Sequence, residues 1–180
     1  MTMQDSHETI VLGGGCFWCT EALLKTLVGV LRATPGYAGG VTEDPTYRQV
    51  CREGTGHAEV VEVEFDPEVI SLEDLLEVFF ATHDPTSLNR QGGDVGTQYR
   101  SIVLYDSYTQ KLKVEKFISE LAGKYDKPIV TEVKELERFY PAEEYHRAYY
   151  DRNPNEPYCR AVISPKIAKL RHGGQASPRA

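Results

Sequence analysis

The chain has 180 residues, of which 41% are hydrophobic and 26% are charged, and its formal net charge at pH 7 is -7. This length and balance are typical of one globular domain, while the acidic charge disfavours nucleic acid and membrane surfaces as partners. No apolar run approaches the roughly 20 residues that a bilayer-spanning helix needs, and the polar segment 1–9 lacks the pattern of a signal peptide. We therefore expect a cytoplasmic protein whose cysteines are thiols.

The first elements in chain order are a short strand at residues 9–12, a helix at 16–27 and a second strand at 30–34. Apolar and β-forming residues predict the strands, and apolar side chains near one face predict the helix. Glycine and proline then recur between residues 35 and 57, which predicts a long loop. A loop of this length in a compact domain is usually functional.

The rest of the chain alternates between regular segments and polar loops. Residues 59–65 alternate between apolar and charged side chains, as a half-exposed strand does, and Ser71 is typical of a helix cap. The further predictions are a helix at 71–83, a loop at 84–97, a strand at 101–105, a helix at 107–122 closed by Gly123, a strand at 129–133, a helical stretch at 142–151 and a mobile tail from Ser164.

This order of elements predicts an α/β (α+β) fold, a two-layer sandwich with a ferredoxin-like core on a mixed sheet. We expect a single catalytic domain whose folded core spans about residues 9–163. Segments 1–8 and 164–180 are expected to be flexible.

Cys16 follows three glycines at the start of the first predicted helix. Glycines permit a sharp turn between strand and helix, and the unpaired N–H groups of a helix N-terminus lower the pKa of a thiol placed there. Because the thiolate is the reactive form of cysteine, this setting favours a nucleophile over a small buried apolar side chain.

Cys19 lies three residues further, so both sulfurs face one side of the predicted helix. Such a C-x-x-C pair serves as a redox disulfide or as half of a zinc site. A zinc site needs a second close pair of ligands, whereas Cys51 and Cys159 stand alone and the histidines are scattered. We therefore expect no metal.

The other candidates for a site are Phe17, Trp18, Tyr47, Glu59, Asp94 and Tyr99. The two residues after Cys16 either pack in the core or line a pocket. Glu59 shares the parity of the inward valines on its strand, so it is either a buried acid with a raised pKa or a strand-end carboxylate in water. Asp94 lies in a glycine-rich loop, where an aspartate ordinarily caps a turn.

The segment Gly14-Gly15-Cys16-Phe17-Trp18-Cys19 resembles the G-C-F-W motif of the peptide methionine sulfoxide reductase A family. Further blocks that are similar to this family lie at residues 36–40, 45–47, 56–60, 83–85 and 96–101. The resemblance runs from about residue 9 to residue 165. Each block alone is weak, and their order and number carry the resemblance.

The resemblance implies that Cys16 attacks the sulfur of methionine sulfoxide and that Glu59 protonates its oxygen. The reaction would repair oxidised proteins, and the S isomer is the expected substrate. The other matches are Tyr47 and Tyr99 to hydroxyls that hold the oxygen, Asp94 to a loop carboxylate that fixes the substrate, and Phe17 and Trp18 to the apolar wall around the methyl group.

The resemblance also implies a cycle that needs no bound cofactor. Cys16 becomes a sulfenic acid, a second thiol forms a disulfide with it, and thioredoxin reduces that disulfide. Cys159 matches the resolving cysteine of many relatives and is favoured over Cys19, while Cys51 is a bystander. The family's frequent extra C-terminal cysteine is absent here. The expected partners are thioredoxin and oxidised proteins or peptides, and the expected state is a monomer.

Three other functions fit part of the pattern. A thiol–disulfide oxidoreductase built on Cys16 and Cys19 would not need Glu59. A cysteine hydrolase would use Cys16 with a base such as His57 and would need no reductant. A zinc-stabilised binding domain would lose its fold on chelation.

Overall fold

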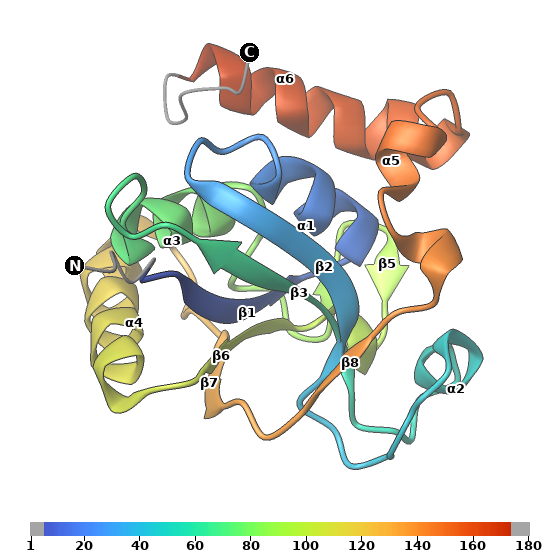
Figure 1. Cartoon of the computed structure of the whole chain (residues 1–180), viewed down its shortest axis with the longest axis horizontal. Coiled ribbons are helices and arrows are strands. Elements are labelled where there is room, and N and C mark those ends of the chain that lie inside the picture. Colours follow the sequence, from blue (N-terminus) through green and yellow to red (C-terminus); the bar gives the residue numbers. More distant parts are fainter. Residues whose placement is uncertain (1–5, 174–180) are drawn as a thin grey trace, which may run out of the picture.

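A computed structural model of the chain describes residues 6–173 and contains one six-stranded sheet with the strand order β7-β6-β1-β3-β2-β8 (Figure 1). β6 pairs in parallel with β7, and the other neighbours are antiparallel. The predicted α/β fold on a mixed sheet is therefore confirmed. The strands are β1 (Glu8–Gly14), β2 (Val30–Ala38), β3 (Ala58–Phe65), β6 (Ser101–Tyr105), β7 (Glu132–Glu135) and β8 (Phe139–Pro141).

One face of the sheet is covered by helices, whose buried residues form the main apolar core with that face. Two of the helices begin at the predicted type of cap: the hydroxyl oxygen of Ser71 accepts from the N–H of Asp74 at 3.1 Å, and that of Ser107 from Gln110 at 3.3 Å. The helices are α1 (Phe17–Leu24), α2 (Tyr47–Cys51), α3 (Leu72–Ala81), α4 (Tyr108–Leu121), α5 (Tyr149–Arg152) and α6 (Ser164–His172).

The opposite face carries a smaller apolar cluster around Val11, Val60 and Ile102, against which Leu136 and Phe139 pack. The first part of β3 is consequently buried on both faces. This differs from the half-exposed strand that the alternation predicts, because a later segment of the chain covers the outer face.

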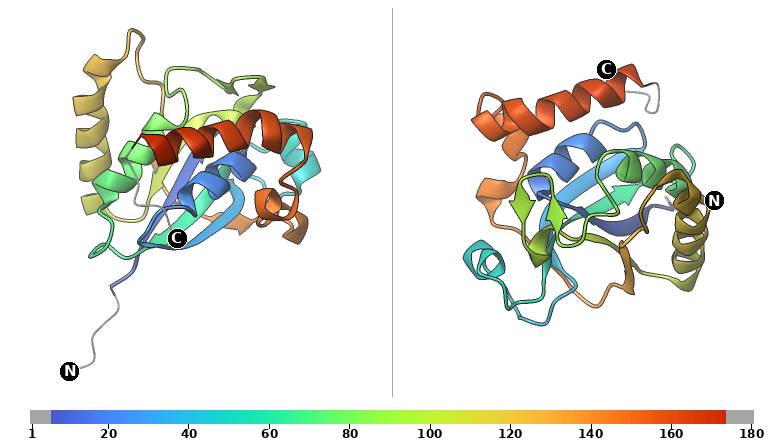
Figure 2. Two further views of the ribbon diagram at one scale, coloured as in Figure 1. Left: turned by 90° about the horizontal axis from the view of Figure 1, so that it is seen from above. Right: turned by 180° about the vertical axis from the view of Figure 1, so that it is seen from behind.

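Helix α1 is buried nearly all round, although the sequence predicts a helix with one apolar face. The segment after β8 covers its outer side, where the carboxylate of Glu21 accepts from the N–H of Ala148 at 2.9 Å. α6 lies across α1 in two opposite views of the molecule (Figures 1 and 2). The first helix is thus enclosed by elements from the far end of the chain.

Several predicted boundaries are wrong for the same reason, that short segments gain hydrogen-bond partners only in the folded chain. The predicted loop 35–57 contains the end of β2 and the helix α2. The loop 84–97 contains a small hairpin of β4 (Arg90–Gln91) and β5 (Asp94–Val95). The stretch 142–151 is mostly irregular, with a short 3-10 turn followed by α5.

The tail from Ser164, predicted to be mobile, instead forms α6 up to His172. Ile167 and Leu170 on this helix are 6% and 5% exposed and belong to the main core. Burial of these two side chains gives the basic segment a fixed place that its composition does not indicate. The predictions for residues 1–5 and 174–180 lie outside the described residues. Between residues 6 and 173, no helix is both long and apolar enough to cross a bilayer.

Candidate active site

Cys16 lies at the turn between β1 and α1, directly before the first residue of the helix. Gly15 has a φ of 108°, and a Cβ there would come within 2.9 Å of the Gln91 side chain. Only glycine combines this backbone with so close an approach. The predicted position of Cys16 at a helix N-terminus is confirmed.

Burial raises the pKa of the Cys16 thiol well above its ordinary value, and the nearby Glu59 raises it further. The N–H of Trp18 and the hydroxyl of Tyr158 act on the sulfur in the opposite direction but do not overcome burial. This direction is opposite to the lowered pKa that the helix N-terminus alone predicts, because the loss of solvent outweighs the helix N-terminus. Cys16 remains partly exposed and lines a cavity of about 380 Å³.

Glu59 is 1% exposed, on the α1 side of β3. Its carboxyl accepts from the N–H of Phe17 at 3.1 Å. Burial raises the pKa of Glu59 to about 8, the negative charge of Asp94 adds to this rise, and the Phe17 N–H opposes it. At neutral pH the group is thus mainly a carboxylic acid, and it lies near Cys16. The buried interpretation of Glu59 is confirmed, and a neutral acid in this place is a proton donor.

Tyrosine hydroxyls surround the acid and the thiol. The pKa of Tyr99 is raised by burial and then by the charges of Glu59 and Asp94. The hydroxyl of Tyr158 donates to Asp94 at 2.8 Å and also acts on the sulfur of Cys16. Tyr47, at the start of α2, has a pKa raised by burial, by Cys51 and by Glu59. All these phenols remain protonated near neutral pH and serve as hydrogen-bond donors.

The two aromatic residues after Cys16 have different surroundings. Phe17 is 1% exposed, with its ring centroid 5.7 Å from Tyr37 and 6.4 Å from Tyr47. Trp18 is partly exposed and stacks on Tyr149 at 3.7 Å between ring centroids. Phe17 therefore packs in the core below the site, whereas Trp18 forms part of an accessible aromatic surface.

The remaining cysteines differ in their access to Cys16. Cys19 lies one helical turn further, acts electrostatically on the Cys16 sulfur and lines the same cavity. Cys159 is fully buried and lies within electrostatic range of Cys19. Cys51 is on α2, and burial raises the pKa of its thiol, an effect that the hydroxyl of Tyr47 opposes. All four cysteines are free thiols.

Comparison with known proteins decides the family. A family model described as peptide methionine sulfoxide reductase matches residues 8–177. The chain belongs to the peptide methionine sulfoxide reductase family. Members of its A type are peptide-methionine (S)-S-oxide reductases, so the predicted family and enzyme class are confirmed.

The similarity to individual members of the peptide methionine sulfoxide reductase family spans almost the whole chain. Peptide methionine sulfoxide reductase MsrA of Natronomonas pharaonis is 59% identical over 165 residues, which are 91% of this chain and 93% of that protein. The structure of Mxr1 from Saccharomyces cerevisiae in reduced form has a TM-score of 0.81 at 37% identity, covering 85% of this chain and 89% of that one. Mxr1 in complex with Trx2 has a TM-score of 0.58 at 29% identity, covering 79% and 84%.

The site of this methionine sulfoxide reductase contains residues that the sequence did not single out. The buried His146 accepts from the indole N–H of Trp18 at 3.0 Å, and Glu143 accepts from the hydroxyl of Tyr37 at 3.2 Å. Tyr158 bridges Asp94 and Cys16. The only feature of the sequence that points to Tyr158 is its place next to Cys159. A lone histidine or tyrosine belongs to no motif that would mark it as part of a site.

Within the reductase, His57 holds a loop together and does not contact the thiol. Its Nδ1 accepts from the N–H of Gly40 at 3.0 Å, and its Nε2 lies 2.7 Å from the carbonyl oxygen of Thr42. Both ring nitrogens are therefore engaged, which leaves none to serve as the base of a cysteine hydrolase. Across residues 6–173 there is no group of three or more His, Cys, Asp or Glu side chains that could hold a metal.

Proposed function

We propose that this chain reduces methionine S-sulfoxide, in proteins and as the free amino acid, with Cys16 as the nucleophile and Glu59 as the acid. The observation that carries the proposal is a neutral, buried carboxyl at the same helix N-terminus as the thiol, with a pKa raised to about 8. A sulfoxide oxygen leaves sulfur only when it is protonated, and a carboxylic acid at this place supplies the proton.

In the first step the sulfur of Cys16 attacks the sulfoxide sulfur while Glu59 protonates the oxygen. The oxygen passes to Cys16, methionine is released, and the cysteine becomes a sulfenic acid. Tyr47 and Tyr99 hold the oxygen by hydrogen bonds, and Asp94 orients Tyr158 toward the sulfur. Trp18 supplies the apolar wall for the methyl group, with Phe17 in the core below the site.

The sulfenic acid is resolved in two steps, first by Cys19 and then by Cys159. Cys19 shares the cavity of Cys16, so its thiol condenses with the sulfenic acid and releases water. The buried Cys159 lies near Cys19 rather than in that cavity. Its thiolate attacks the Cys19 sulfur, forms a Cys19–Cys159 disulfide and releases Cys16 as a thiol. Cys51 takes no part.

Thioredoxin supplies the dithiol that reduces this disulfide, a proposal supported by the solved complex of the related Mxr1 with Trx2. No bound cofactor or metal enters the cycle. We further propose a cytoplasmic monomer with one catalytic domain. A ferredoxin-like core is supported by the β-α-β-β-α-β order of β1, α1, β2, β3, α3 and β6.

The test is turnover of the two stereoisomers of methionine sulfoxide with dithiothreitol as reductant. We expect reduction of the S isomer, little reduction of the R isomer, and no turnover by Cys16→Ser. A thiol–disulfide oxidoreductase would keep its activity after Glu59→Gln, and a hydrolase would work without reductant. Either result would overturn the proposal.

A further inference from the structure

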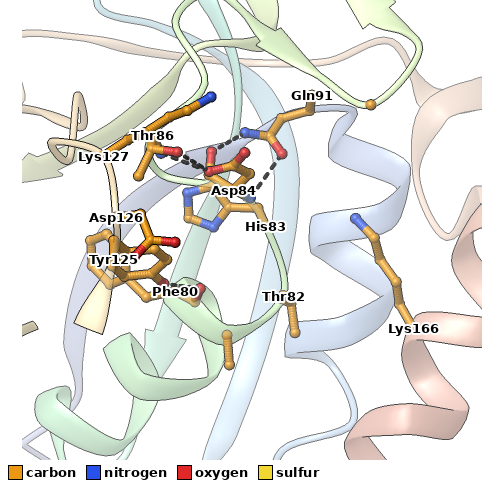
Figure 3. Close-up of a pocket in the computed structure, with 12 residues that line it drawn as sticks. Phe80, Thr82, His83, Asp84, Thr86, Gln91, Tyr125, Asp126, Lys127 and Lys166 are labelled. Atoms are coloured by element: carbon orange, nitrogen blue, oxygen red, sulfur yellow. Dashed lines mark hydrogen bonds between the residues drawn. The ribbon is translucent and has the colours of Figure 1, made fainter.

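Figure 3 shows a second, larger cavity, with a volume of about 710 Å³. Its lining includes Thr82, Asp84, Gln91, Gly92, Lys127 and Lys166. Three of these residues, Gln91, Gly92 and Lys166, also line the cavity that contains Cys16. The two cavities are therefore neighbours with these residues between them, and we name the larger one the flanking groove.

The boundary between the two parts is fixed by the side chain of Gln91. Its amide oxygen accepts from the N–H of Asp84 at 3.0 Å, and its amide nitrogen donates to the carbonyl oxygen of Asp84 at 2.5 Å. Gly92 and Gly93 beside it are exposed, and a Cβ at either would meet nothing within 4 Å. A polypeptide backbone therefore has open space to pass this point.

The flanking groove has a volume well beyond that of one side chain. Ligand pockets range from about 300 to 1,000 Å³, so a cavity of about 710 Å³ has room for several residues of a peptide. The reaction itself needs only the methionine side chain at Cys16. The additional space fits the residues next to the oxidised methionine.

The charges at the entrance of the flanking groove indicate the preferred neighbours. Lys127 and Lys166 lie on either side of Gln91, while Asp126 lies near Tyr125 (Figure 3). The Oδ1 atom of Asp84 accepts from the N–H and the hydroxyl of Thr86 at 2.9 and 2.6 Å, and this carboxylate keeps its negative charge. Lys127 lies within electrostatic range of Asp84, and Lys166 acts on the thiol of Cys19, but neither lysine forms a salt bridge within residues 6–173. On a chain with a net charge of -7, these ammonium groups are a local site for carboxylates.

We propose that the flanking groove binds the segment of a protein substrate beside methionine sulfoxide and favours an acidic residue there. This inference rests on the proposed function, because it assigns the groove to the substrate of the reaction at Cys16. The partner is an extended, locally unfolded peptide segment with a carboxylate within a few residues of the oxidised methionine.

The test uses a set of short peptides with one methionine S-sulfoxide and one aspartate moved along the positions on either side. Matched peptides carry asparagine instead. Dithiothreitol is the reductant, so no protein reductant is present. The variant is Lys127→Glu, and the control is Lys124→Glu, the same charge change on an exposed lysine that does not line the groove.

We expect the wild-type enzyme to have a kcat/KM about two- to fivefold higher for the aspartate peptides at the best positions, the range of an exposed ion pair. Lys127→Glu should abolish or invert this ratio, and Lys124→Glu should keep it. The preference should weaken as salt is added.

Equal rates for aspartate and asparagine peptides, or equal effects of the two variants, would overturn the inference. A parallel assay replaces dithiothreitol with thioredoxin. If Lys127→Glu changes the rate only in that assay, the groove belongs to the reductant and the inference is overturned. If N-acetyl-methionine S-sulfoxide itself is not reduced, the proposed function fails instead.

Discussion

Replacing Glu59 with glutamine keeps the size of the side chain and removes its titration. The folded chain holds the Glu59 proton up to a pH of about 8, whereas an unfolded glutamate releases it near 4.5. Each pH unit between these values costs the fold about 1.4 kcal/mol, because only the unfolded chain gains from ionisation. The stability that the protonated Glu59 gives the wild-type fold is thus fully present below pH 4.5 and is lost as pH rises to about 8.

The expected result is a variant that is more stable than the wild type and nearly inactive. At pH 7 the difference in free energy of unfolding should be about 3 kcal/mol, rising to about 5 kcal/mol above pH 8. Loss of the general acid should lower kcat by about 100-fold or more. A glutamine oxygen can still accept from the Phe17 N–H, so the turn at Cys16 keeps its hydrogen bond.

Urea unfolding of both proteins at several pH values, in the presence of a reductant, measures the difference. Glu120→Gln, which removes one exposed carboxylate on α4, controls for the change in net charge. A difference between wild type and Glu59→Gln that stays constant from pH 5 to pH 9 would refute the reasoning, because Glu59 would then not titrate as a buried acid.

Three further outcomes follow from the same structure. In a single turnover without external reductant, Cys159→Ser should still form methionine and a Cys16–Cys19 disulfide, which mass spectrometry would detect. Cys19→Ser should stop at the sulfenic acid, which a sulfenic-acid probe would label. Tyr158→Phe removes the hydroxyl that acts on Cys16 and should lower kcat/KM by about 10- to 100-fold, the value of a hydrogen bond to a charged group. Stopped-flow alkylation of this variant at several pH values should show a still higher pKa for Cys16. Leu170→Ala on α6 should cost about 2 kcal/mol or more in urea unfolding, while the same change at the exposed Leu88 should cost little.

The sequence predicts those parts of the site that depend on local pattern. The parity of β3 places Glu59 on the side of Val61, and the glycines before Cys16 place it at a helix N-terminus. Both features depend on residues that are close together in the chain. The assignment of Asp94 and Tyr99 came from the resemblance, and neither position has a local signal of its own.

The remaining features depend on contacts between distant segments. α6 is stable because Ile167 and Leu170 pack against apolar side chains from the first half of the chain, and the same contact encloses α1. The pKa of Cys16 also depends on contacts between distant segments. Local sequence indicates a helix N-terminus, but the burial that decides the direction comes from elements that only the fold brings together.

The high pKa values of both reacting groups are consistent with the proposed reaction. Thiol and sulfoxide together carry no charge, and neither do sulfenic acid and methionine, so the reaction brings no net charge into the cavity before or after the step. Glu59 gives its proton to the oxygen and recovers one from Cys16, and its transient carboxylate is held by the N–H of Phe17. A site that keeps both groups protonated until a sulfoxide arrives also protects Cys16 from oxidants that attack thiolates. Burial therefore slows the oxidation of Cys16 by other oxidants. It costs the proton transfer to the sulfoxide little free energy, because that transfer creates no net charge.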